Sequence, residues 1–291
     1  VRSLPPQPSS SDPLLLHRLA SFVNGCNNVQ PALARTGNSF YLGSRGTPVK
    51  KLVPLGRVEH MRVVIADDEA DVVAFLKSIV EELGHIAVSF ADGNKLAQAL
   101  MRETFDLVIL DWNIPGKDGI DLLKWMQTAL PEHPPVIMMT NRSAKKDISD
   151  ALNAGADDYI TKPEDRSVVA ARINAMLRRN AGAGAFDAEA VYGKYHLNRL
   201  DQSVTVNGET ITMTAKEFEL ADLFFRNADR TLSRNYIMET IWRTNAVLAT
   251  RTLDMHISRV RAKLDLQPEN GFRIFTVFGY GYRLETITTS N

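Results

Sequence analysis

The chain has 291 residues, of which 44% are hydrophobic and 23% are charged, and its formal net charge is zero. This length is typical of two domains with hydrophobic cores, and the zero net charge excludes nucleic-acid binding through bulk charge alone. The only cysteine, Cys26, excludes an internal disulfide, and no apolar run approaches a membrane span of about 20 residues, so we expect a cytoplasmic protein.

Residues 1–60 differ in composition from the rest of the chain. They are rich in Pro, Ser, Gly and Arg and carry 7 Lys and Arg against 2 Asp and Glu. This composition predicts a disordered segment. Because a regular pattern starts at Met61, we expect residues 1–60 to be a non-native leader, from upstream translation or from the expression system. A genuine regulatory extension is the alternative.

Short apolar runs alternate with helical patterns from residue 61 to 180. The runs are "RVVIA", "IAVSF", "DLVIL", "PVIMMT" and "DYIT". Continuous apolar strands separated by helices predict an α/β domain with a doubly wound, five-stranded parallel sheet of the flavodoxin-like type. Its ligand site is expected at the carboxyl ends of the strands. The small residues of 181–190 then predict a linker.

The pattern changes over residues 191–287. Short strand-like runs surround an "NG" hairpin turn, and three helical segments follow: "AKEFELADLFFRNA", "SRNYIMETIW" and "TRTLDMHISRVRAKL". The run "FRIFTVFGYGYRLE" then predicts two strands around a glycine-bearing turn. A small sheet, three helices and a hairpin predict an α+β winged helix-turn-helix domain.

Acidic and polar residues follow the predicted strands of the first domain. Asp67 and Asp68 end the first strand, Asp111 ends the third, Thr140 ends the fourth and Lys162 follows the fifth. A lone aspartate there more often caps the next helix, but five positions at four strand ends favour a shared site. We predict that the acids bind Mg²⁺ and that the Asp111 carboxylate accepts a phosphoryl group. The Thr140 hydroxyl and the Lys162 ammonium then take the other phosphoryl oxygens.

The motifs "DDE", "LDWNIPGKDG", "MMT" and "GADDYITKP" occur in this order, and residues 61–180 resemble the receiver domain of response regulators. The motifs "MTAKEFELADLFFRN" and "TVFGYGYRL" make residues 191–287 similar to the winged-helix output domain of the OmpR/PhoB class. The resemblance implies a phosphorylation-controlled, DNA-binding transcriptional regulator and not an enzyme acting on other substrates. Its implied partners are a sensor histidine kinase, double-stranded DNA and a second copy of the chain.

The resemblance also implies roles around the phosphoacceptor. Mg²⁺ is bound by Asp68, Asp111 and the backbone carbonyl of Asn113, with Asp67 helping through water. Thr140 and Tyr159 form the switch pair. Thr140 moves toward the phosphoryl group, and the Tyr159 ring enters the space that Thr140 leaves. The alternative for Tyr159 is an amphipathic tyrosine on the surface.

In the family, the fourth helix, fifth strand and fifth helix build a dimer through charged pairs. Asp158 and Arg172 stand at positions that match one such pair, whereas Ile148 and Val168 replace the two charges of another. Exposed ion pairs contribute little, so an apolar contact can replace one. We expect dimerisation that depends less on salt and on phosphorylation. Glu164 stands where the family usually has Phe, and the sequence gives no reason for it.

The segment "TRTLDMHISRVRAKL" is predicted to be the helix that reads DNA. Apolar residues fall on one face at helical spacing and should pack inward: Leu253, Ile257, Val260 and Leu264. The second helix of a helix-turn-helix enters the major groove. The predicted contacts are Arg251, Thr252, His256, Arg259, Arg261 and Lys263. A basic, solvated face without a DNA role is the alternative.

The final hairpin departs from the family at its tip. Phe278 stands where the family usually carries an arginine that reaches the minor groove. We predict a wing that contributes less to DNA binding, with Arg273 or Arg283 taking phosphate contacts. The alternative is that Phe278 inserts apolar surface into the groove. Four aromatic residues are predicted to belong to the core: Phe218, Phe224, Trp242 and Tyr282.

Two other functions fit part of the pattern. Phosphatases of the haloacid dehalogenase type use a strand-end aspartate with Mg²⁺ but need a second aspartate two residues later, where this chain has Asn113. The second alternative is a regulator that retains the pocket but does not depend on phosphorylation. The intact Asp111, Thr140 and Lys162 argue against that reading, whereas Ile148 and Val168 keep it open.

Overall fold

The computed structural model describes residues 60–130, 132–181, 187–244 and 250–287. The predicted leader, except for His60, and half of the predicted linker lie outside these residues. The described residues group into one compact unit. None of the helices in the described ranges combines the length and apolarity needed to cross a membrane.

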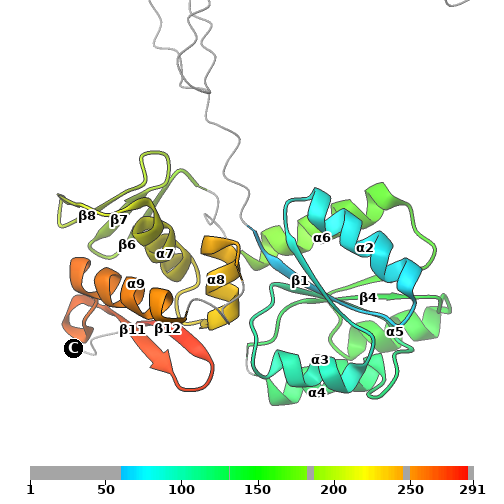
Figure 1. Cartoon of the computed structure of the whole chain (residues 1–291). Helices are drawn as coiled ribbons and strands as arrows, with labels where there is room; N and C mark the ends of the chain where they lie inside the picture. Colours follow the sequence, from blue (N-terminus) through cyan, green and yellow to red (C-terminus); the bar gives the residue numbers. More distant parts are fainter. Residues whose placement is uncertain (1–59, 131, 182–186, 245–249, 288–291) are drawn as a thin grey trace, which may run out of the picture. The chain divides into compact units, whose positions relative to one another are not determined.

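The first part of the chain forms the predicted parallel sheet (Figure 1). The strand order is β2-β1-β3-β4-β5, so the chain crosses over between β2 and β3. The residues of β1, β3 and β4 are buried along their whole length, which is why these strands have no polar face. The strands are β1 (Arg62–Ala66), β2 (Ile86–Phe90), β3 (Leu107–Leu110), β4 (Val136–Thr140) and β5 (Asp158–Thr161).

Five helices cover the two faces of this sheet (Figure 1). Val63 and Ile65 of β1 pack with residues of α2 and α6, whereas Val64 and Ala66 pack with residues of α3, α4 and α5. This alternation along one strand follows from the two-residue period of side-chain direction. The helices are α2 (Ala70–Glu82), α3 (Gly93–Leu100), α4 (Gly119–Ala129), α5 (Lys145–Asn153) and α6 (Arg166–Asn180).

The second part of the chain is the predicted winged helix. A four-stranded antiparallel sheet comes first: β6 (Glu189–Tyr192), β7 (Tyr195–Asn198), β8 (Ser203–Val206) and β9 (Glu209–Ile211). The predicted "NG" turn joins β8 to β9, with φ of 51° at Asn207 and 85° at Gly208. The helices are α7 (Ala215–Arg226), α8 (Arg234–Trp242) and α9 (Thr250–Lys263).

A second sheet completes this domain, with the strand order β10-β12-β11. The strands are β10 (Thr231–Ser233), β11 (Phe272–Val277) and β12 (Gly281–Thr286), and a short 3₁₀ turn, η2 (Pro268–Asn270), precedes β11. β11 and β12 form the predicted hairpin. β10 was not among the predicted strands, because three residues are too few to show a strand period.

The core of the winged helix confirms the predicted inward face of α9. Leu253, Ile257, Val260 and Leu264 are fully buried. The predicted core aromatics are also in place, since Phe218, Phe224 and Tyr282 are buried and Trp242 packs against this core. A capping box starts α7: the Glu217 amide donates to the Thr214 hydroxyl, and the Thr214 amide donates to the Glu217 carboxylate.

Candidate functional site

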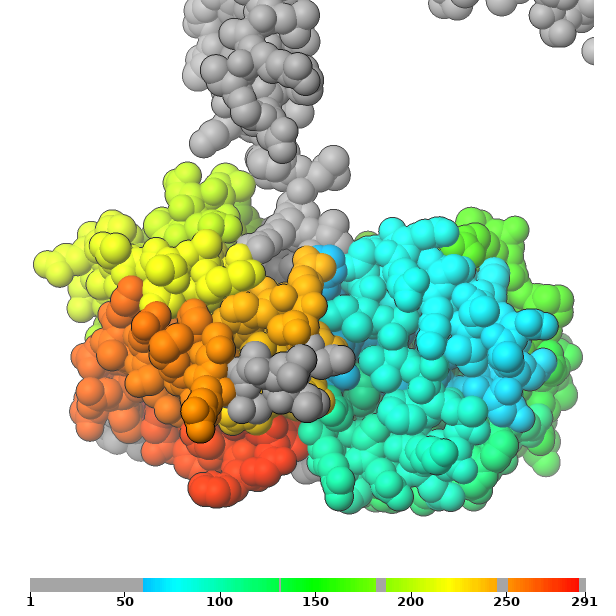
Figure 2. Space-filling view, in the orientation of Figure 1, coloured from blue at the N-terminus to red at the C-terminus, as the bar shows by residue number. Residues whose placement is uncertain are grey.

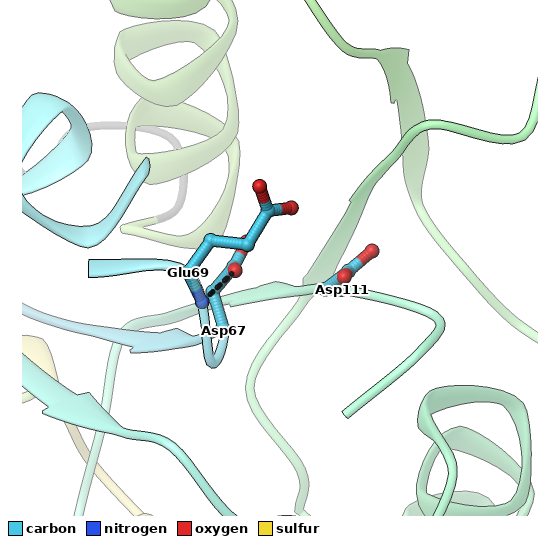
Figure 3. A group of neighbouring side chains, drawn as sticks. All are labelled: Asp67, Glu69 and Asp111. Carbon is cyan, nitrogen blue, oxygen red and sulfur yellow. Dashed lines mark hydrogen bonds between the residues drawn. The ribbon is translucent and has the colours of Figure 1, made fainter. Parts of the chain in front are cut away.

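A pocket of carboxylates lies where β1 and β3 end. These strands are paired in parallel, with Ala66 beside Leu110, so the residues that follow them meet at one edge of the sheet. Carboxylate oxygens of Asp67, Glu69 and Asp111 all lie within 4.8 Å of one another (Figure 3). The structure therefore brings together two of the predicted metal ligands and adds Glu69. The third acid of "DDE" was the sequence signal for Glu69.

The Lys162 ammonium group lies close to all three carboxylates. The Lys162 Nζ lies 2.6 Å from Asp67, 3.3 Å from Glu69 and 3.5 Å from Asp111. Burial raises the pKa of Asp67, and the hydrogen bond from Lys162 offsets this only in part. Burial lowers the pKa of Lys162. The hydrogen bond to Asp67 and the charge of Asp111 raise it by more than burial lowers it, so the pKa of Lys162 lies above its ordinary value. The upward direction for Lys162 is that of a site with excess negative charge, which suits a hard divalent cation.

The Thr140 hydroxyl is free to bind an incoming group. Thr140 ends β4 and is completely buried, and its Oγ1 has no hydrogen-bond partner among the described residues. A buried hydroxyl without a partner is unfavourable, so such an atom commonly serves a ligand that comes and goes. Thr140 and Lys162 therefore lie where the sequence predicted donors for phosphoryl oxygens.

Tyr159 is buried and not a surface tyrosine. Its side chain is 9% exposed, and its hydroxyl donates to the Arg142 backbone carbonyl over 2.7 Å. Burial raises the pKa of Tyr159, so the phenol stays protonated and keeps this bond. The loop after Thr140 is thus tied to β5 through Tyr159.

Two predicted metal ligands lie at the edge of the pocket. Asp68 and Asn113 are exposed, and the Asn113 side chain accepts a hydrogen bond of 3.1 Å from Arg142. The Arg142 guanidinium also lies over the Trp112 ring, 4.7 Å from its centroid. Neither Asp68 nor the Asn113 side chain joins the carboxylate group in the structure.

Trp112 lies next to Asp111, so its intrinsic fluorescence can report metal binding in the pocket. It directly follows Asp111 and is 8% exposed. We expect added Mg²⁺ to change the tryptophan fluorescence in a saturable way, and we expect Glu69→Gln to weaken this binding by about tenfold because one carboxylate charge is lost. A fluorescence titration measures both. Trp112→Phe is the control that should lose the signal, and unaltered affinity in Glu69→Gln would remove Glu69 from the site.

The six predicted DNA contacts on α9 fall into two groups. Arg251 and Arg259 are exposed and make no hydrogen bond or ion pair with other described residues. They lie eight residues apart, roughly 12 Å along the helix, on the side that also exposes Met255. In the space-filling view α9 lies at the surface in orange (Figure 2). Arg251 and Arg259 are therefore the two predicted contacts whose charges face solvent without a partner among the described residues.

Arg261 and Lys263 fix α9 to the rest of the domain. The Arg261 guanidinium donates to the Ile274 carbonyl of β11 at 2.8 and 3.1 Å. The Lys263 ammonium lies 2.8 Å from the Glu217 carboxylate and also donates to the Thr212 carbonyl. Both positive charges thus have structural partners, which sequence spacing alone did not indicate.

His256 and Thr252 are half-buried and face each other across one helical turn. His256 Nδ1 lies 2.8 Å from the Thr252 carbonyl, and the imidazole ring packs edge-on against Trp242. Asp254, in the same helical turn, accepts hydrogen bonds from Arg234 of α8 and from the Tyr282 hydroxyl of β12. These contacts orient α9 relative to α8 and the hairpin.

The tip of the β11–β12 hairpin exposes an aromatic ring. Phe278 is 99% exposed. The two arginines predicted to bind phosphate both pair with one acid: Arg273 lies 2.5 Å and Arg283 lies 2.6 Å from carboxylate oxygens of Glu285. Their charges are therefore partly neutralised within the hairpin.

The four predicted dimer residues lie on α5, β5 and α6. Asp158 and Arg172 form an ion pair within the chain, since both Asp158 oxygens lie 2.8 Å from Arg172 Nη1. Ile148 and Val168 are half-buried. Val168 belongs to the lining of an open hollow, whose other lining residues are Asp158, Ser167, Ala171, Arg172, Ala175, Met176 and Arg179. Glu164 accepts a hydrogen bond from the Asp165 amide, which does not explain its presence.

Two family models match this chain, and several known proteins are similar to it. Residues 63–174 match the response regulator receiver domain family, and residues 208–284 match the family of transcriptional regulatory protein C-terminal domains. The sensory transduction protein RegX3 of Mycolicibacterium smegmatis is 37% identical over 226 residues, covering 77% of this chain and 98% of that protein. The phosphate regulon transcriptional regulatory protein PhoB of Pseudomonas aeruginosa is 32% identical, covering 77% and 97%. The crystal structure of DrrB, an OmpR/PhoB homologue of Thermotoga maritima, is 25% identical, covers 78% of this chain and 99% of that one, and aligns with a TM-score of 0.38.

A receiver domain with an acidic pocket, followed by a winged helix, defines a DNA-binding response regulator of a two-component system. The chain matches both domain families, and it covers nearly the whole length of its relatives. These two findings identify the family within this class of protein. It belongs to the OmpR/PhoB family of response regulators. It is thus a transcription regulator by family and not a typical enzyme.

Proposed function

We propose that this protein is a transcriptional regulator whose DNA binding is switched on by phosphorylation of Asp111 by a sensor histidine kinase. The observation that carries the proposal is the group around Asp111: a lysine 3.5 Å away, neighbouring carboxylates, and the Thr140 hydroxyl without a partner. The regulator acts in the cytoplasm, where bacterial DNA and the kinase domain are both accessible.

The chemistry is a transfer between two side chains. An oxygen of the Asp111 carboxylate attacks the phosphorus of a phosphohistidine, a new O–P bond forms, and the N–P bond to the kinase imidazole breaks. Lys162 and Thr140 bind and orient the phosphoryl oxygens. Asp67 and Asp111 would hold Mg²⁺ together with Glu69, or with the predicted Asp68 and backbone carbonyl of Asn113, and the ion would supply positive charge beside the phosphoryl group.

Phosphorylation acts on the surface of α5, β5 and α6. Thr140 turns toward the phosphoryl oxygens, and Tyr159 follows because its hydroxyl bond to Arg142 links β5 to the loop after Thr140. We infer that this movement favours a homodimer through Ile148, Val168 and the neighbouring pair of Asp158 and Arg172.

The dimer is expected to depend little on salt. Ile148 and Val168 provide apolar contact, and Asp158 is already neutralised within its own chain. We expect less than about a threefold change in the dimer dissociation constant between low and high ionic strength. Analytical ultracentrifugation of the unphosphorylated and phosphorylated protein across a salt series measures this. A strict monomer at high concentration in both states would contradict the proposed interface.

DNA recognition is assigned to α9. As the second helix of the helix-turn-helix, it enters the major groove, where exposed Arg251 and Arg259 can bind guanine edges or phosphates. Thr252 and His256 lie at the side of this face, and Arg261 and Lys263 hold the helix in place. The neutral net charge of residues 181–291 makes these two arginines the main local source of positive charge on α9.

The wing is expected to contribute weakly, because Phe278 offers no charge and both nearby arginines are paired with Glu285. Phe278→Arg should therefore raise DNA affinity, by about three- to tenfold, since an arginine at the tip can reach the minor groove. Fluorescence anisotropy with the cognate DNA measures the change. A loss of affinity would show instead that the Phe278 ring itself makes a favourable groove contact.

The function as a whole is tested by DNA footprinting with and without acetyl phosphate. We expect protection of specific promoter fragments that becomes stronger with the phosphodonor. Equal protection in both conditions would favour the phosphate-independent regulator. Steady turnover of a generic phosphate ester, with no footprint, would favour the phosphatase.

A further inference from the structure

Two asparagine–glycine pairs lie in the winged helix, in different surroundings. Asn207 and Gly208 form the turn between β8 and β9, whereas Asn270 ends η2 and Gly271 precedes β11. Asparagine is a thermally labile residue, and it deamidates most readily before glycine, which has no side chain to hinder attack by its backbone nitrogen. The sequence therefore makes both pairs reactive, and their contacts in the fold decide which one reacts.

The reacting groups of the first pair are accessible. Asn207 and Gly208 are exposed, and the Asn207 side chain makes no hydrogen bond with other described residues. A Cβ added at Gly208 would meet nothing within 4 Å, so the space around the turn is open. The Asn207 amide donates to the Lys194 carbonyl at 3.2 Å, but the Gly208 amide has no acceptor in the part of the chain that the structure describes. Neither the side-chain carbonyl carbon nor the attacking nitrogen is held.

The turn between β8 and β9 can also open at low cost. Both of its residues have positive φ, as in a type I′ turn, and β9 has only three residues. β9 lies at the edge of its sheet, and Glu209 and Thr210 on it are exposed. A short, exposed edge strand opens far more often than a domain unfolds. Asn207 can therefore reach the conformation that closes a ring while the rest of the domain stays folded.

The second pair is held by hydrogen bonds. The Asn270 Nδ2 donates to the Asp265 backbone carbonyl at 2.8 Å and to the Asp265 carboxylate at 2.6 Å. The Asn270 Oδ1 accepts a 2.7 Å bond from the Lys194 ammonium. The Gly271 amide donates to the Pro268 carbonyl at 3.1 Å. Several bonds must therefore break before the Gly271 nitrogen can attack the Asn270 side chain.

We propose that Asn207 is a site of spontaneous deamidation and that the fold protects Asn270 from the same reaction. The Gly208 backbone nitrogen attacks Cγ of Asn207, a C–N bond forms, and the side-chain nitrogen leaves as ammonia, taking up the proton that the Gly208 nitrogen loses. The product is a cyclic imide. Water then opens the ring: cleavage at the side-chain carbonyl gives aspartate, and cleavage at the main-chain carbonyl gives isoaspartate, in which the chain continues through the side chain.

Both products change the winged helix. Each adds a carboxylate, so residues 181–291 pass from 13 Lys and Arg against 13 Asp and Glu to 13 against 14. Isoaspartate also adds one atom to the main chain of a two-residue turn, which disturbs the pairing of β8 with β9. Val204 of β8 is fully buried in the core of this domain. The isoaspartate form is therefore expected to unfold at a lower temperature than the unmodified protein.

Incubation of the full chain in mildly alkaline buffer tests the site, with peptide mapping by mass spectrometry at intervals. We expect Asn207 to deamidate at least about tenfold faster than Asn270, because hydrogen bonds protect Asn270. In denaturing urea both should react at similar rates, since the contacts are then lost. A protease that cleaves before aspartate but not before isoaspartate separates the two products. Asn207→Gly is the control, because glycine accepts the positive φ of this position and has no amide to lose.

Lys194→Met tests the protection of Asn270. The substitution removes the ammonium bound to the Asn270 Oδ1 but keeps the backbone carbonyl that accepts from the Asn207 amide. We expect deamidation at Asn270 to speed up by about threefold or more, and the rate at Asn207 to stay unchanged. Equal rates at both sites in the folded protein would overturn the proposal, as would an Asn207 that reacts only in urea. No gain at Asn270 in Lys194→Met would overturn its protective half.

Discussion

Replacing Asp111 by asparagine is expected to abolish phosphoryl incorporation from acetyl phosphate, with a fall in rate of at least about 1,000-fold. The amide lacks the anionic oxygen that attacks phosphorus, whereas its size keeps the pocket packed. The product in the wild type is an acyl phosphate, so hydroxylamine should release the label. Incorporation is measured with labelled phosphodonor and by intact mass.

The control for this variant is Asp121→Asn. Asp121 is an exposed carboxylate on α4, outside the pocket, so its loss should leave labelling unchanged. The Asp111→Asn protein should also show no increase in DNA binding with acetyl phosphate. If it were labelled as readily as wild type, another side chain would be the acceptor and the proposed role of Asp111 would fail.

Removal of both exposed arginines of α9 is expected to have the second large effect. Arg251→Ala with Arg259→Ala should weaken binding to the footprinted DNA by about 100-fold, because each base or phosphate contact accounts for roughly 1–3 kcal/mol. An arginine that binds phosphate should also reduce the salt dependence, by about one counterion for each contact. Anisotropy titrations at several salt concentrations separate the two roles.

Arg178→Ala serves as the matched control, since Arg178 is an exposed arginine on α6 of the receiver. Its removal lowers the net charge by one, as each single α9 substitution does, but should leave affinity within about twofold. Circular dichroism confirms that each variant is folded. Unchanged affinity in the double α9 variant would remove α9 as the DNA-reading helix.

The sequence did not predict that Arg261 and Lys263 of α9 have partners within the domain. Helical spacing separated the inward face from the polar faces, and Leu253, Ile257, Val260 and Leu264 are buried as predicted. The same spacing treats all outward cations alike. Only folding brings the Ile274 carbonyl to Arg261 and Glu217 to Lys263, because these partners lie far along the chain.

The carboxylate pocket also combines residues that the sequence predicted with one feature that only the structure decided. The order of strands and helices predicted that Asp67, Asp111, Thr140 and Lys162 follow strand ends on one edge, and the structure brings them together. The choice between Asp68 and Glu69 depends on the turn that starts α2. That turn directs Glu69 toward Lys162 and leaves Asp68 exposed.

By itself, the sequence determined the alternation of strands and helices, the buried faces and the edge of the sheet where charge collects. These follow from periods of two and 3.6 residues, which are local properties of the chain. The tertiary structure alone decided other charge pairs: both hairpin arginines with Glu285, and Lys263 with Glu217. An ion pair depends on the separation of two atoms in space, and a linear pattern does not contain that distance.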